Sequence, residues 1–271
     1  MKVRILVGVC LVAILALLLI LGGYPLMIAL AVFSCAAVYE MGLALRNKGL
    51  RPWLYANYAL ALAAPFLYFL FGIVALLIAY VASVAVTMVC SLLIAKTEAQ
   101  DMMAALFIHE YPTLMLICMA LVYFSFDRAI GLTAACLAFA APSFTDSVAY
   151  FVGTLFGRHK LCPAISPHKT VEGACGALLG GIVFGAILIP LQTLWHGMTP
   201  PLALLLIGLG CGVFSQIGDF VASFVKRWAG IKDYSSIFPG HGGVLDRLDS
   251  ILFCSPFVLV CMNVVERMGT R

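Results

Sequence analysis

Long, nearly uncharged apolar stretches decide what this chain can fold into. Of its 271 residues, 64% are hydrophobic and only 10% are charged, whereas a soluble domain carries roughly 25% charged residues. So few charged side chains cannot cover a surface that faces water. The stretches lack the alternating polarity of barrel strands, which favours membrane helices. The sequence therefore predicts an all-α integral membrane protein, a polytopic helical bundle.

About nine segments are apolar enough to span a membrane, since one span needs about 20 apolar residues. The first segment is interpreted as a retained span rather than a signal peptide, because no small-x-small cleavage site follows it. A weak interruption near Phe71-Gly72 divides the third stretch in two. The predicted spans are residues 3–22, 24–45, 53–71, 73–95, 112–127, 129–153, 172–195, 201–225 and 250–266.

The basic residues indicate the orientation, because cytoplasmic loops carry an excess of Lys and Arg. With nine spans and a cytoplasmic N-terminus, all but three of the 16 Lys and Arg residues lie on the cytoplasmic side. The three exceptions are Arg128, Arg267 and Arg271. We therefore expect a multi-pass protein of the inner (cytoplasmic) cell membrane, with the polar loops 154–171 and 226–249 in the cytoplasm.

The chain is expected to form one membrane-embedded domain over residues 1–271. Residues 1–127 would supply N-terminal spans, and residues 129–271, which hold most of the polar motifs, would be the catalytic half. The amphipathic loop 96–111 is interpreted as an interfacial connector. Glu40, near the end of the second span, is expected to be interfacial or paired and is assigned no chemical role. The ten cysteines form no CxxC pair, so neither a zinc site nor a disulfide framework is expected.

The end of the eighth predicted span carries charged residues, in the stretch SQIGDFVASFVKR. Asp219, Ser223, Lys226 and Arg227 stand at positions i, i+4, i+7 and i+8, which share one helical face. A carboxylate deep in a span costs about 2.5–3.5 kcal/mol on insertion scales unless it meets protein, water or a cation. One interpretation is a structural pairing of Asp219 with Lys226 or Arg227. The other is binding of a metal ion or a phosphate.

The loop that follows ends in PGHGGVLDRLD. Pro239 favours a turn, and glycines such as Gly242 and Gly243 permit close approach of the backbone to a ligand, whose anionic groups the exposed amides can bind. Asp246 and Asp249 share a helical face one turn apart, and their charges repel unless a cation lies between them. Oxygen-only ligands suit Mg²⁺. The alternative is an acidic pair stabilised by a helix N-terminus.

A second polar segment covers residues 146–173. Asp146 is another acid inside a span, for which function is the default interpretation. A basic cluster follows, which ordinary cytoplasmic flanking charge could also explain; it consists of Arg158, His159, Lys160, His168 and Lys169. A helix is expected to start within Ser166–Glu172, with Lys169 or Thr170 near its cap. A helix N-terminus beside a lysine is an anion site.

Together these segments resemble the phosphatidate cytidylyltransferase (CDP-diglyceride synthetase) family. The signature lies between Ser223 and Asp249 and reads SxVKRx₄KDxSx₂FPxHGGVxDRLD, without a departure. The upstream QxGD ending at Asp219 and the DxxAYxxG beginning at Asp146 fit as well. SPHKTVEG resembles the family's SPKKTWEG but departs at His168 and Val171, which puts the role of position 168 in doubt. The strong resemblance begins at about residue 140.

The resemblance implies an Mg²⁺-dependent enzyme that makes CDP-diacylglycerol and pyrophosphate from CTP (or dCTP) and phosphatidate, in a bundle that forms dimers. It does not imply a nucleic-acid partner. The implied metal ligands, for one ion or two, are Asp219, Asp249, Asp246 and Asp146. The implied catalytic residues are Asp219, Lys226, Arg227, Asp246, Arg247 and Asp249. The implied substrate-binding residues are Ser166, Lys169, Ser223, Lys232, His241, Gly242 and Gly243.

Two other functions fit parts of the pattern. Another membrane enzyme that moves phosphate groups, such as a prenol-phosphate sugar transferase or a dolichol-kinase-like protein, would share the acids and lysines but use a different donor. An ion-coupled transporter could use Asp146 and Asp219 as carriers. Transporters often contain internal repeats, and no convincing repeat is visible in this sequence.

Overall fold

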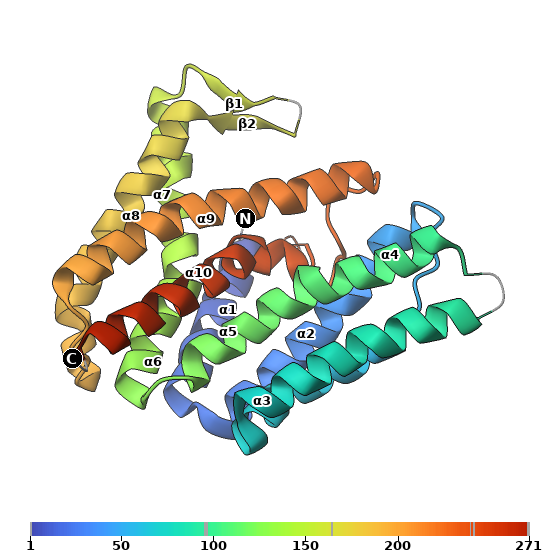
Figure 1. Cartoon of the computed structure of the whole chain (residues 1–271). Coiled ribbons are helices and arrows are strands. Elements are labelled where there is room, and N and C mark those ends of the chain that lie inside the picture. The colour runs from blue at the N-terminus through green and yellow to red at the C-terminus, as the bar shows by residue number, and fades with distance from the viewer. Residues whose placement is uncertain (1, 95–96, 164, 239, 241, 270–271) are drawn as a thin grey trace. The chain divides into compact units, whose positions relative to one another are not determined.

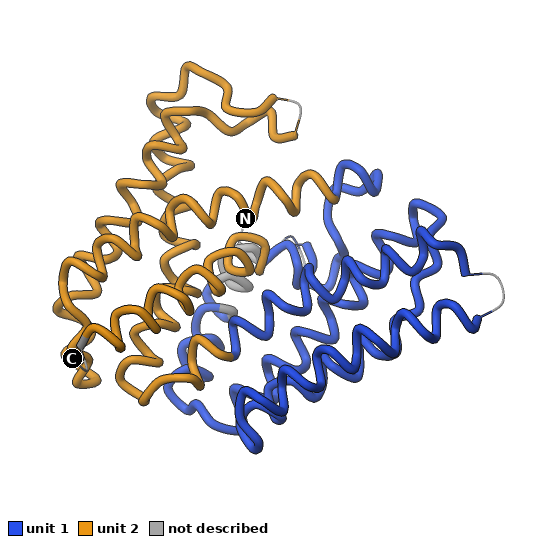
Figure 2. Tube along the Cα trace, in the orientation of Figure 1, with its two compact units in different colours: residues 1–120, 226–247 blue, residues 121–225, 248–271 orange. Residues whose placement is uncertain are grey.

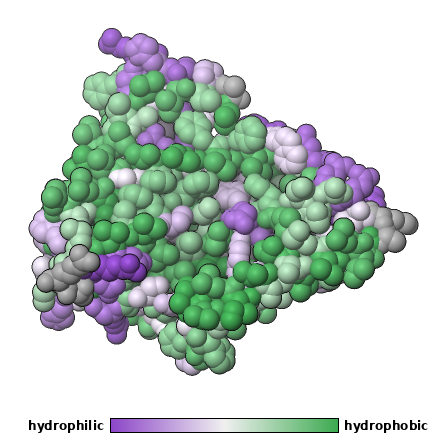
Figure 3. All heavy atoms as spheres, in the orientation of Figure 1, coloured by the Kyte–Doolittle hydropathy of each residue, from purple (hydrophilic) through white to green (hydrophobic). Residues whose placement is uncertain are grey.

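The protein is built from apolar helices, as expected. The computed structural model describes residues 2–94, 97–163, 165–238, 240 and 242–269, and seven helices in these ranges are long and apolar enough to cross a membrane. They belong to two compact units, residues 1–120 with 226–247 and residues 121–225 with 248–271 (Figure 2). Hydrophobic side chains cover most of the face drawn in Figure 3. The count of nine spans and the cytoplasmic N-terminus stay predictions.

The first unit contains a helical hairpin at the predicted break near Phe71-Gly72. The elements that residues 1–120 contribute to this unit are α1 (Lys2–Leu21), α2 (Gly23–Arg46), α3 (Tyr55–Leu93), α4 (Ala99–Ile108), η1 (His109–Leu114) and most of α5 (Met115–Phe124) (Figure 1). Gly72 has φ +78° and ψ −173°, a conformation that interrupts α3. The Ser83 hydroxyl donates to the Ala56 carbonyl at 3.0 Å, although a straight helix would separate these residues by about 40 Å. The predicted break near Phe71-Gly72 is therefore confirmed, and α3 folds back on itself there.

Residues 99–124 differ from the expected arrangement of a connector followed by a span. The Asp101 carboxylate accepts from the Glu98 amide at 3.1 Å and the Arg51 amide at 2.6 Å, which closes the N-terminus of α4. Ala105, Ile108 and His109 are fully buried, and a π-helical turn, η1, joins α4 to α5. An interfacial connector would keep one face in water. The helical segment therefore begins at Ala99 rather than at 112, and it ends at Phe124.

The second unit holds the remaining helices. Its elements are the end of α5, α6 (Arg128–Ala135), η2 (Cys136–Ala140), α7 (Ala141–Phe156), β1 (Lys160–Cys162), β2 (Ser166–Thr170), α8 (Val171–Leu191), η3 (Gln192–Trp195) and most of α9 (Pro201–Trp228) and α10 (Leu245–Gly269). The loop between α9 and α10, with the adjoining ends of both helices, belongs to the first unit. The two compact units are therefore not consecutive stretches of the chain, and the division into N-terminal spans and a catalytic half stays a prediction.

Glycines let the helices of the second unit approach backbone to backbone, as small residues do in membrane bundles. A Cβ added at Gly181 would collide with the Gly208 carbonyl, and a Cβ at Gly208 would collide with the Gly181 carbonyl, which joins α8 to α9. At Gly218 an added Cβ would collide with the Asp249 carbonyl, which joins α9 to α10. This last contact lies beside Asp219, so it brings two predicted site acids onto closely packed helices.

A small antiparallel hairpin, β1–β2, precedes α8 and was not expected in an all-α protein. Lys160 pairs with Thr170, and Cys162 pairs with Ser166. Residues 166–170 form a strand, and the helix α8 starts at Val171, within the predicted range. The predicted cap is confirmed at Thr170, whose hydroxyl accepts from the Gly173 amide at 3.1 Å. An N-cap hydroxyl of this kind satisfies an amide that the helix leaves unpaired.

Candidate functional site

The predicted site residues fall into two polar clusters, one in each unit. The acid–lysine cluster lies in the second unit and consists of Asp146, Lys169, Asp219 and Ser250. The loop cluster lies in the first unit and consists of Glu40, Lys226, Tyr234, Ser235, Gly243, Val244, Leu245 and Asp246. Each cluster draws its residues from the elements of its own unit.

Four elements meet in the acid–lysine cluster. Lys169 on β2 forms an ion pair with Asp219 on α9, and its ammonium lies 4.3 Å from the centre of the Phe220 ring. Asp146 on α7 accepts from the Ser250 hydroxyl on α10 at 2.8 Å, and it lies close enough to Asp219 and Lys169 to feel both charges. Residues from separate sequence motifs thus meet in this cluster, and Lys169 balances the charge of Asp219.

The partner of Asp219 comes from outside its own helix. Asp219 is paired with Lys169 and not with Lys226 or Arg227, the partners considered on its own helix. Both side chains keep about a quarter of their surface exposed, 24% for Lys169 and 28% for Asp219. A charged pair with this exposure remains accessible to a charged ligand.

Asp249 lies one residue before Ser250 on α10. One of its carboxylate oxygens accepts from the Ser250 amide at 2.8 Å, and its carbonyl faces Gly218. Its side chain is half-buried. The close packing at Gly218 therefore places the backbone of Asp249 beside the residue that precedes Asp219.

The β1–β2 hairpin is attached to α8 through Glu172. The Glu172 carboxylate accepts from the Arg158 and His159 amides and lies 2.7 Å from the His159 ring nitrogen Nδ1. His159 is 78% exposed, so the side-chain pair itself adds little stability. The backbone hydrogen bonds nevertheless fix the start of β1 to the first turn of α8, two residues after Thr170.

The acid–lysine cluster suits a magnesium ion that phosphates help to hold. Among the residues that the structure describes, no three His, Cys, Asp or Glu side chains are grouped closely enough to bind an ion alone. Mg²⁺ commonly uses one or two carboxylates and takes its other ligands from water and substrate phosphates. The neighbouring carboxylates of Asp146 and Asp219 fit that requirement, because they offer only oxygen ligands.

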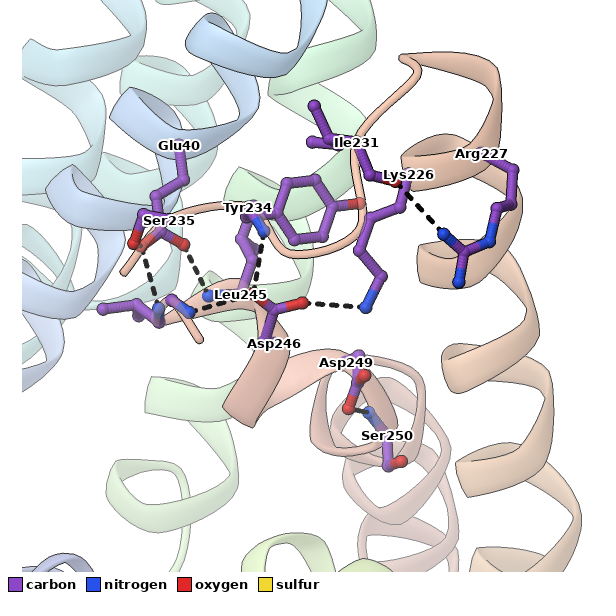
Figure 4. A network of polar contacts seen from close by, with 12 residues as sticks. Glu40, Lys226, Arg227, Ile231, Tyr234, Ser235, Leu245, Asp246, Asp249 and Ser250 are labelled. Carbon is purple, nitrogen blue, oxygen red and sulfur yellow. Dashed lines mark hydrogen bonds and ion pairs between the residues drawn. The ribbon is translucent and has the colours of Figure 1, made fainter. Parts of the chain in front are cut away.

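Asp246 organises the loop cluster from the first turn of α10 (Figure 4). One oxygen accepts from Lys226 Nζ at 2.7 Å, and the other accepts from the Tyr234 amide at 2.8 Å and the Gly243 amide at 2.9 Å. Asp246 is 6% exposed. A carboxylate has about four acceptor positions, so three are in use. These contacts stabilise the loop, and its role as a metal ligand stays a prediction.

Glu40 joins the same loop from α2. Its Oε1 accepts from the Ser235 hydroxyl at 2.6 Å and the Val244 amide at 2.9 Å, and its Oε2 accepts from the Leu245 amide at 2.8 Å. Glu40 is completely buried. It was expected to be interfacial or paired and was assigned no role, so sequence reasoning missed its contribution. The rule that singled out Asp146 and Asp219 as acids inside spans would have found it.

The loop glycines lie against carboxylates of the protein itself. Gly242 has φ +80°, and a Cβ there would lie 2.7 Å from Asp246 Oδ2. A Cβ at Gly243 would collide with the Glu40 carboxylate. Protein carboxylates therefore approach the backbone of both glycines closely. Their contact with a nucleotide stays a prediction.

The other predicted residues have looser surroundings. Arg227 is exposed and donates to the Ile231 carbonyl at 3.3 Å, while Lys232 and Arg247 are exposed. Ser166 and Ser223 are half-buried. His241 and Pro239 lie outside the described residues. Exposed cations suit contacts with a ligand more than contacts that stabilise the fold.

Comparison with known proteins finds relatives of this chain and a family that it matches. Three similar proteins are named phosphatidate cytidylyltransferase. That of Bacillus subtilis is 49% identical over 114 residues, that of Staphylococcus haemolyticus 38% over 144, and that of Staphylococcus aureus (strain COL) 39% over 142. In the same order, the alignments cover 42%, 52% and 52% of this chain. They cover 41%, 53% and 53% of the relatives, so the matched region spans about half of the length of each relative. The profile described as the cytidylyltransferase family matches residues 2–265, nearly the whole chain, and the chain therefore belongs to that family.

Proposed function

We propose that this protein transfers the cytidylyl group of CTP or dCTP to phosphatidate, releasing pyrophosphate and leaving CDP-diacylglycerol in the membrane. Family membership and the names of the relatives support the reaction class and both substrates. The observation that carries the proposal is the convergence of Asp146, Lys169 and Asp219, which come from three separate family motifs. Carboxylate oxygens and a lysine ammonium are the groups that a phosphate–metal complex would use, and this supports the proposal.

The reaction needs little proton chemistry. A non-bridging oxygen of the phosphatidate phosphate attacks the α-phosphorus of CTP and forms the new P–O bond. The bond from that phosphorus to the bridging oxygen of the β-phosphate breaks, and pyrophosphate leaves with the electron pair. A phosphate monoester is mostly dianionic at pH 7, because its second pKa is about 6. The enzyme therefore mainly has to position the reactants and neutralise charge.

The residues have distinct tasks in this scheme. Asp146, Asp219 and Asp249 would hold Mg²⁺, with Asp246 as a further candidate, and a second ion is compatible with this number of acids. When bound, the metal stabilises charge on the attacked and leaving phosphate oxygens. Lys169 would neutralise phosphate oxygens from β2, and Ser166 would assist it in binding CTP. The residues proposed to balance the triphosphate and lipid phosphate are Lys226, Arg227, Lys232 and Arg247.

The remaining assignments concern binding and the cell. Ser223, His241, Gly242 and Gly243 are proposed to contact the substrates. The long apolar helices and the bacterial relatives support a cell-membrane protein. We propose nine spans, a cytoplasmic N-terminus, a site that faces the cytoplasm, and a homodimer. The acyl chains of phosphatidate would stay in the bilayer while its headgroup reacts.

The proposal predicts CTP- and Mg²⁺-dependent turnover. Purified full-length protein, given phosphatidate vesicles and labelled CTP, is expected to release pyrophosphate and form labelled lipid. Chelation should abolish the reaction, and added Mg²⁺ should restore it. UDP-sugars in place of CTP serve as the control for a sugar transferase. Turnover with UDP-sugars alone would contradict the proposed donor, and full turnover in chelator would contradict the metal.

A further inference from the structure

Glu40 is an acid in the interior of the first unit. Its neighbours along α2, Ala37, Val38, Met41 and Ala44, are buried and apolar. A carboxylate in such surroundings is costly unless hydrogen bonds satisfy it. A residue of this kind is retained in a stable fold only where its partners are held in place, so its partners indicate what it does.

The partners of Glu40 come from two separate parts of the loop between α9 and α10. Ser235 lies near the middle of the loop, whereas Val244 is its last residue and Leu245 begins α10. Leu245 is the first residue of α10, and the first amides of a helix lack partners within the helix. The Glu40 carboxylate satisfies one of these amides and lies at the positive end of the helix dipole. One side chain thus joins the middle and the C-terminal end of the loop to α2.

The loop has a space matched to this carboxylate. An added Cβ at Gly243 would lie 2.7 Å from the Glu40 carboxyl carbon and would collide with one oxygen. The Gly243 amide donates to Asp246, whose other oxygen binds Lys226. The backbone of residues 243–245 is therefore held between two carboxylates, Glu40 from α2 and Asp246 from α10 (Figure 4).

We propose that Glu40 is a positioning residue for the reaction: it holds the loop in the shape in which Lys226 meets Asp246. Glu40 contacts the loop and not the reacting atoms, so it acts through these two residues. The inference rests on the proposed function for its effect on turnover. It makes α2, in the region assigned only to N-terminal spans, part of the catalytic structure.

Glu40→Gln in the full-length protein tests the proposal. Glutamine keeps the size of the side chain, but its NH₂ group cannot accept, so one loop amide loses its partner. We expect kcat per folded molecule at saturating CTP to fall at least tenfold, while KM for CTP rises less than threefold. The matched control is Glu110→Gln, which changes an exposed acid of the same unit that accepts from Tyr80 at 2.8 Å. This control is expected to stay within twofold of the parent protein.

Two results would overturn the proposal: an unchanged kcat in Glu40→Gln, or an equal loss in Glu110→Gln. If Glu40→Gln yields no folded protein, Ser235→Ala decides, because it removes one of the three hydrogen bonds and leaves the carboxylate in place. A threefold or larger fall in kcat would support the positioning role, and an unchanged kcat would overturn it. Counting kcat per folded molecule separates positioning from a loss of stability alone.

A second measurement separates this inference from the proposed function. If the parent protein forms no CDP-diacylglycerol, the proposed function fails, and the position of the loop is then measured by tryptic cleavage after the exposed Lys232. We expect Glu40→Gln to be cleaved at least tenfold faster than the parent, and Glu110→Gln to be cleaved at the same rate as the parent. Equal rates in all three proteins would overturn the inference, whatever the reaction is.

Discussion

At the scale of single residues, the acids inside apolar helices carry most of the information. Asp146, Asp219 and Glu40 each occupy a position that is expensive in a membrane protein, and each has a specific partner: Ser250, Lys169 and the loop amides, respectively. Two of these three acids were recognised from the sequence. Their partners were not, because pairing between side chains far apart in the chain depends on how the helices pack.

Lys169→Ala is predicted to remove a cation from the phosphate site. Loss of one preorganised group that stabilises developing charge typically lowers turnover about 10²-fold, and we expect kcat/KM for CTP to fall by about that factor. Membrane insertion should be unchanged, because the side chain lies on a short strand. The assay is CTP-dependent lipid formation, compared with Lys48→Ala, an exposed lysine of another loop. Parent-like activity in Lys169→Ala would remove this residue from the site.

At the scale of elements, small residues decide which helices touch. The contact of α9 with α10 depends on Gly218, where the Asp249 carbonyl occupies the space of a side chain. In the loop cluster, Gly243 has the same effect toward Glu40. A sequence shows where glycines stand but not what each one faces. The loop glycines Gly242 and Gly243 lie against the carboxylates of Asp246 and Glu40, which the sequence did not indicate, and their contact with a nucleotide stays a prediction.

Gly218→Ala is predicted to push α9 and α10 apart beside Asp219. Overpacking of this kind usually destabilises a protein by about 1–3 kcal/mol, and we expect a lower thermal transition together with at least a fivefold loss of activity. Ile217→Ala is the matched control, because Ile217 is exposed on the same turn of α9 and its truncation adds no atoms. An unchanged transition and unchanged activity in Gly218→Ala would show that the helices yield without cost.

At the scale of the whole molecule, each compact unit combines two stretches that are separate in the sequence. Residues 226–247 fall in one unit with residues 1–120, although more than 100 residues separate them in sequence. The N-terminal spans therefore contribute directly to the segment that carries the family signature. A division into N-terminal spans and a catalytic half misses this connection, because it follows only the order of the motifs.

The orientation of the chain gives a prediction at this scale. The charge bias predicts that the N-terminus and both polar loops lie in the cytoplasm and that the C-terminus lies outside. A periplasmic reporter such as alkaline phosphatase, fused after Arg271, should be active, whereas the same reporter inserted after Lys232 should be inactive. A fluorescent reporter that matures only in the cytoplasm should give the opposite pattern. Cytoplasmic fluorescence from the C-terminal fusion would contradict the count of nine spans or the orientation of the first.

The sequence alone determined the class of fold, the break at Gly72, a helix cap at Lys169 or Thr170 and the family, because each depends on local composition, backbone preference or a contiguous motif. Only the tertiary structure decided that Asp219 pairs with Lys169, that Asp101 and His109 are buried within a helical unit, and that Glu40 holds the loop. These outcomes arise from packing between helices whose surfaces are all apolar, so hydropathy does not distinguish their neighbours. Backbone approach at glycines and the need to satisfy each buried charge select the arrangement that forms.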